Sequence, residues 1–95
     1  MIEYLCNNEK YITAFVEWIL VNENLEVDDN GTHMAIVELF IHPELNGYQT
    51  LKHFVREILQ KAPTAQTCTF VREYKYKGKQ PRTYTRKQFE RFAEV

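Results

Sequence analysis

The chain has 95 residues and a formal net charge of −1, with 44% hydrophobic and 14% aromatic residues. This length allows one domain, residues 1–95, with one modest core that needs neither a metal nor a disulfide. Two distant cysteines without a CxxC motif indicate free and mostly buried thiols in a reducing compartment. No apolar run is long enough to span a bilayer, so we expect a soluble cytoplasmic protein with no membrane partner.

The first predicted element is a helix that Asn7 or Asn8 caps and that runs to about Asn22. Helical spacing would place four apolar residues on one face of it, namely Ile12, Phe15, Val16 and Ile19. After this helix, residues 25–27 are predicted to pair with the following strand as a β-hairpin. The intervening DDNG sequence, residues 28–31, favours such a turn because these residue types tolerate positive φ.

The strand predicted from about Thr32 to Ile41 is apolar at nearly every position, which is typical of a central strand covered on both faces. Glu38 is the exception. A helix is expected next, from about Gly47 to Lys61, and Pro63 ends it. Its spacing turns an apolar face inward and leaves four polar residues outside, namely Lys52, His53, Arg56 and Gln60.

The last third of the chain begins with a predicted strand from Gln66 to about Tyr76, whose side chains alternate between two faces. A loop over residues 77–81 and a short strand over residues 82–84 follow. Residues 85–88, Thr-Arg-Lys-Gln, form a capping box that predicts a final helix with Phe89 and Phe92 facing inward.

The expected order is therefore helix, β-hairpin, helix, strand, short strand, helix. A strand–helix–strand unit with short links favours parallel neighbours and a right-handed crossover. We predict an α/β (α+β) fold, a small mixed β-sheet flanked by helices.

The segment from the strand at 34–41 through the helix at 47–61 to the strand at 66–74 resembles the central motif of the general N-acetyltransferase (GNAT) superfamily. In that family the strand is followed by a Q/R-x-x-G-x-G/A loop that binds the pyrophosphate of acetyl-CoA. Here the loop reads ELNGYQTL, residues 44–51, with Gly47 at the first glycine. The chain also looks like the short GNAT-like proteins of phages and prophages, whose ends read similarly to KYKGKQPRTYTRKQF.

The resemblance implies acetyl-CoA as cofactor and an amine as acceptor, without a metal. The residues it would place at the cofactor are Ile41, His42, Leu45, Asn46, Gly47, Tyr48, Gln49 and Thr50. Two positions depart from the family pattern. Glu44 puts a negative charge where the pyrophosphate would lie, and Gln49 adds a side chain where close backbone approach is needed. The backbone N–H donors of residues 46–50 would survive both changes.

The same resemblance implies a general base and an acid that protonates the leaving thiolate. Glu38 stands at the position of the base, and Tyr74 and Tyr76, with Tyr84 nearby, are candidates for the acid. The structural alternatives are that Glu38 pairs with a Lys or Arg of a neighbouring element and that each tyrosine serves packing. The three histidines lack the spacing of metal ligands.

Charge distribution supports a different function. Residues 1–65 hold four Lys/Arg against ten acids, whereas residues 66–95 hold eight against three. Basic residues interleaved with aromatic ones favour a nucleic acid or another anionic partner, such as an acidic protein. The residues that would bind it are Arg72, Lys75, Lys77, Lys79, Arg82 and Arg86. A third alternative is a non-catalytic interaction protein, in which a homodimer would cover the exposed sheet edge.

Overall fold

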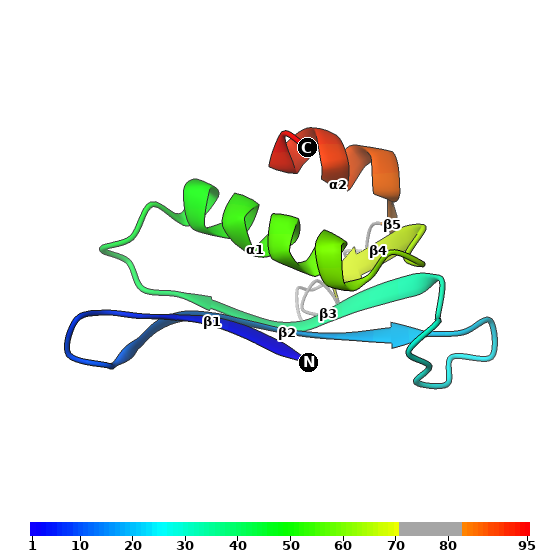
Figure 1. Ribbon diagram of the computed structural model, residues 1–95, viewed down its shortest axis with the longest axis horizontal. Coiled ribbons are helices and arrows are strands. Elements are labelled where there is room, and N and C mark those ends of the chain that lie inside the picture. The colour runs from blue at the N-terminus through cyan, green and yellow to red at the C-terminus, as the bar shows by residue number, and fades with distance from the viewer. Residues whose placement is uncertain (71–82) are drawn as a thin grey trace, which may run out of the picture.

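The computed structural model describes residues 1–70 and 83–95, which form a mixed sheet with two helices (Figure 1). In chain order the elements are β1 (Ile2–Cys6), β2 (Ile12–Val21), β3 (His33–Ile41), α1 (Gly47–Lys61), β4 (Thr67–Phe70), β5 (Thr83–Thr85) and α2 (Arg86–Ala93). The predicted small α/β fold with a mixed sheet is confirmed.

The five strands of the described chain lie in the sheet in their sequence order, β1-β2-β3-β4-β5. All neighbours are antiparallel except β3 and β4, which pair in parallel from His33 opposite Thr67 to Ile36 opposite Phe70. Helix α1 connects these two strands, as a parallel pair requires. This confirms the predicted parallel strand–helix–strand unit.

Both helices lie on the same side of the sheet (Figure 1). Alternate residues of β2 point toward them and are buried: Ala14, Val16, Trp18 and Leu20. From the helix side, Phe54, Val55 and Ile58 of α1 complete this core. We expected β3 to be covered on both faces, and this is wrong. The two described helices cover one face only (Figure 1), and on the other face Phe40 is 42% exposed.

The helix predicted to run to Asn22 is wrong, because residues 12–21 form a strand. The segment is apolar on both faces, so its residues fit a helical spacing as well as an alternating one. Pairing with β1 on one side and β3 on the other decides between them. The segment is also rich in β-branched and aromatic residues, which favour strands.

The predicted hairpin lies in the same region and also needs correction. Residues 25–27 form no strand. Val27 makes a single antiparallel bridge to Val21, and the partner of β3 is β2. In the loop between β2 and β3, Gly31 is required because the backbone of Val21 lies too close to leave room for a side chain. A Cβ atom at that position would lie 2.4 Å from the carbonyl oxygen of Val21.

The two predicted helices of the second half are confirmed. Helix α1 has the predicted bounds, and Asn46 caps it by accepting the N–H of Gln49. Helix α2 begins with the predicted capping box, in which Thr85 accepts from Gln88 N–H and Gln88 accepts from Thr85 N–H. Phe89 is buried, and β4 turns Cys68 toward the core as expected. The predicted continuation of this strand to Tyr76 lies outside the described residues.

Lys52 is an exception on α1, because it was expected on the solvent side and is buried. The C-terminal end of α2 covers it, and its ammonium group donates to the carboxylate of Glu94. The ammonium also lies 4.6 Å from the centre of the Tyr48 ring. Neither helix of the described chain is long and apolar enough to cross a membrane.

Candidate functional site

The predicted cofactor residues gather where β3 leads into α1. The strand ends at Ile41, and a short turn follows in which Leu45 N–H donates to the carbonyl of His42 at 2.9 Å. The His42 side chain accepts the N–H of Glu44 through Nδ1 at 3.1 Å. His42 therefore has a structural function in the turn. Its ring is fixed beside the start of the helix.

The first turn of α1 satisfies its own backbone only in part. The Asn46 side chain accepts the N–H of Gln49 at 3.0 Å, and the Asn46 carbonyl accepts the N–H of Thr50 at 2.9 Å. The N–H groups of Gly47 and Tyr48 belong to the helical positions that have no intrahelical acceptor. Apart from its chain neighbours and the backbone of its own helix, a Cβ on Gly47 would meet no atom within 4 Å, so open space lies beside this backbone.

Some features of this turn favour binding of an anion, and others oppose it. The first turn of α1 contains no acidic residue, which favours a bound phosphate. Glu44 is exposed and lies just before the helix, where its charge opposes one. Tyr48 is 58% exposed and packs edge-on against Phe92, with ring centroids 5.3 Å apart.

Glu38, the predicted base, lies on the face of the sheet opposite the helices. Leu39 next to it packs against the core, so alternation turns Glu38 away from the core. It is half-buried and stands opposite Glu17 of β2. A β-bulge in the β2–β3 pairing lies immediately beside this pair of carboxylates.

Of the three candidate acids, only Tyr84 lies among the described residues. Tyr74 and Tyr76 lie outside the described residues. Tyr84 lies on β5 and turns to the helix side of the sheet, where its ring contacts Phe70 and Phe89. Tyr84 and Glu38 therefore occupy opposite faces, and Tyr84 has a packing function.

Arg86, predicted to bind an anionic partner, instead joins the two helices. Its guanidinium donates to the carbonyl oxygen of Ala62, the C-cap of α1, at 2.9 Å and to that of Ala65, beyond the following turn, at 2.8 Å. It also pairs with Glu90 at 3.1 Å. These contacts assign Arg86 a structural role. The other five basic residues predicted for nucleic acid, Arg72, Lys75, Lys77, Lys79 and Arg82, lie outside the described residues, so binding of a nucleic acid or another anionic partner stays a prediction.

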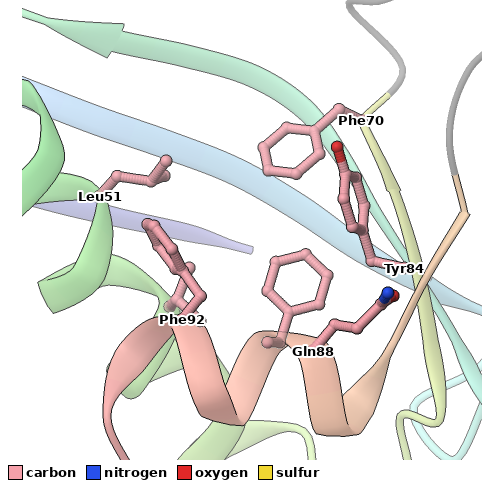
Figure 2. Close-up of a pocket in the computed structure, with 7 residues that line it drawn as sticks. Leu51, Phe70, Tyr84, Gln88 and Phe92 are labelled. Atoms are coloured by element: carbon pink, nitrogen blue, oxygen red, sulfur yellow. The ribbon is translucent and has the colours of Figure 1, made fainter.

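The structure also reveals a cavity of about 420 Å³ that the sequence did not predict (Figure 2). Its apolar walls come from both helices and β4, namely Leu51, Val55, Phe70, Phe89 and Phe92. Tyr84 and Gln88 add one hydroxyl and one amide. The sequence predicted the inward apolar faces of α1 and α2. It did not predict how far apart the two helices lie, which determines the size of the cavity.

Among the described residues, no group of three or more His, Cys, Asp or Glu side chains is arranged to hold a metal ion. Compared with known proteins, the chain matches no family model, no curated protein and no solved structure. Membership of the GNAT superfamily therefore stays a prediction.

Proposed function

We propose that this protein binds acyl-CoA where β3 leads into α1 and transfers the acyl group to an amine. The observation that carries the proposal is the open first turn of α1. Gly47 and Tyr48 offer backbone N–H groups there, and the side of Gly47 is empty. A helix N-terminus with free donors and a favourable dipole is suited to a pyrophosphate.

Glu38 is the residue of this chain that would accept a proton. It lies three residues before the end of β3, about 10 Å along the strand from the turn. In the reaction, the amine nitrogen forms a bond to the thioester carbonyl carbon and the carbon–sulfur bond breaks. The amine gives its proton to the Glu38 carboxylate. The leaving thiolate takes a proton from a general acid, for which the resemblance suggests Tyr74 or Tyr76.

The substitution Gly47→Ala separates ligand binding from folding. The new methyl group meets nothing in the protein, so we expect stability to be unchanged or raised by about 0.4–1 kcal/mol. The same methyl group blocks close approach of a phosphate. Isothermal titration should then show affinity for acetyl-CoA lowered about tenfold, as expected for loss of one charge-assisted hydrogen bond.

Two further variants complete the test. Glu44→Gln removes the opposing charge and should tighten acetyl-CoA binding without altering the fold. Glu38→Gln should abolish acyl transfer to an amine and leave acetyl-CoA affinity unchanged. The proposal is wrong if millimolar acetyl-CoA produces no heat and no NMR shift at residues 45–50 of the wild-type protein.

A further inference from the structure

We propose that the cavity between α1, α2, β4 and β5 is a binding site for a small, uncharged aromatic molecule that carries a hydrogen-bond acceptor. A volume of about 420 Å³ lies within the range of pockets for small ligands. The proposal does not depend on acyl-CoA binding.

The walls of the cavity favour an aromatic ligand. Phe70 and Phe89 stack with centroids 6.1 Å apart, whereas Tyr84 stands edge-on to both rings. The cavity therefore presents aromatic faces and edges side by side. Because aromatic rings prefer offset-stacked or edge-to-face neighbours, a flat ring can satisfy both preferences at once.

The residues that line the cavity also indicate the charge of the ligand. The described residues that line the cavity carry no ionised group. A charged ligand would lose its hydration there without gaining a partner of opposite charge, so an uncharged one is favoured.

The Gln88 amide on the polar side of the cavity favours a ligand with an acceptor. Figure 2 shows Tyr84 and Gln88 together on the β5 side, opposite Leu51 and Phe92. The Gln88 amide oxygen already accepts the N–H of Thr85 at 2.8 Å as part of the helix cap. This bond fixes the side chain, and its amide nitrogen is the group left to donate to a ligand.

Quinoline and naphthalene are the matched probes for this site, because they have the same shape and only quinoline has a ring nitrogen that accepts a hydrogen bond. Both should bind the wild-type protein near neutral pH and shift the methyl NMR signals of Leu51 and Val55. Gln88→Glu keeps the acceptor for the Thr85 N–H and removes the amide donor. It should weaken quinoline binding about fivefold, the equivalent of one hydrogen bond, and leave naphthalene binding within about twofold.

Leu51→Phe provides an independent test, because it fills the cavity from a half-buried position and keeps the wall apolar. Binding of both probes should fall about tenfold or more. Circular dichroism and the thermal midpoint check that the variant folds. The proposal fails if neither probe shifts the Leu51 and Val55 methyl signals of the wild-type protein, or if a folded Leu51→Phe variant binds them unchanged. Tighter binding of n-octanol than of either probe would overturn the preference for an aromatic ligand.

Discussion

Glu3 illustrates how one polar residue can hold two elements together. It lies on β1, is 9% exposed, and accepts a hydrogen bond from the indole Nε1 of Trp18 at 3.1 Å. Its second carboxylate oxygen pairs with Lys61 at the C-terminal end of α1. The Glu3 carboxylate of β1 therefore contacts both β2 and α1.

Glu3→Ala should lower the free energy of unfolding by about 2–3 kcal/mol, because it leaves the buried Trp18 N–H without an acceptor. Glu3→Gln keeps an acceptor oxygen and should cost about 1 kcal/mol. Urea titration followed by the fluorescence of Trp18, the single tryptophan, measures both. The exposed Glu9→Ala is the matched control and should change nothing; equal effects of Glu3→Ala and Glu9→Ala would contradict the assignment.

The two cysteines differ in their surroundings. Cys6 is exposed, so the expectation of two mostly buried thiols is wrong for it. Cys68 faces the core, and burial raises the pKa of its thiol to about 12. Cys68 therefore stays protonated and shielded at neutral pH. A thiol reagent should label one equivalent rapidly in the native protein and two in denaturant, and Cys6→Ser should remove the rapid one. Fast labelling of two thiols in the native state would refute this placement.

At the scale of elements, α1 and α2 each provide an arginine that binds carbonyl groups at the C-terminal end of the other helix. The Arg86 guanidinium at the start of α2 donates to the carbonyl groups of Leu59 and Ala62 at the end of α1. At the other end, Arg56 of α1 donates to the carbonyl of Ala93 at 2.6 Å. The C-terminal end of each helix thus finds a donor on the other helix for carbonyl groups that a helix cannot satisfy internally.

Arg86→Lys should destabilise the protein by about 1.5–3 kcal/mol, because a single ammonium nitrogen cannot replace the contacts of Nη1 with Ala62, Nη2 with Leu59 and Nε with Glu90. The exposed Lys87→Ala is the control and should be nearly neutral. Thermal unfolding measures both variants. If Arg86→Lys were as stable as wild type and only lost affinity for an anionic partner, the structural role would be wrong.

At the scale of the whole molecule, the ion pair between Lys52 and Glu94 joins the middle of the chain to its C-terminus. The hydrogen bond from Lys52, and then its charge, lower the pKa of Glu94. The hydrogen bond to Glu94 is likewise the largest cause that raises the pKa of Lys52, against the opposing effect of desolvation. A lowered carboxyl pKa stabilises the folded state above the unfolded pKa, and the gain is lost as the pH falls through the folded value.

The contribution of this pair should therefore be present at neutral pH and disappear in acid, as Glu94 becomes protonated. It should also disappear in strong alkali, above the ordinary pKa of lysine, once Lys52 loses its proton. Urea midpoints of wild type and Glu94→Gln should differ at neutral pH and converge at acidic pH. A difference that persists unchanged in acid would show that another interaction is responsible.

Local signals were sufficient for some elements of this fold. Asn46, Gly47 and Pro63 delimit α1, and the Thr85–Gln88 capping box begins α2, because such signals act within a few residues of the chain. The turn between β3 and α1 was predictable for the same reason. The cofactor residues proposed there lie at adjacent positions, so the sequence alone brought them together.

The sequence by itself thus determined the bounds of α1, the start of α2, the parallel strand–helix–strand unit and the mixed sheet, all of which depend on local pattern and short connections. The tertiary structure decided between helix and strand for residues 12–21, because a segment that is apolar on both faces fits either spacing and takes its conformation from its neighbours. It also decided the burial of Lys52 and the aromatic cavity. Both depend on how α2 packs against α1, a contact between segments more than thirty residues apart that no local pattern specifies.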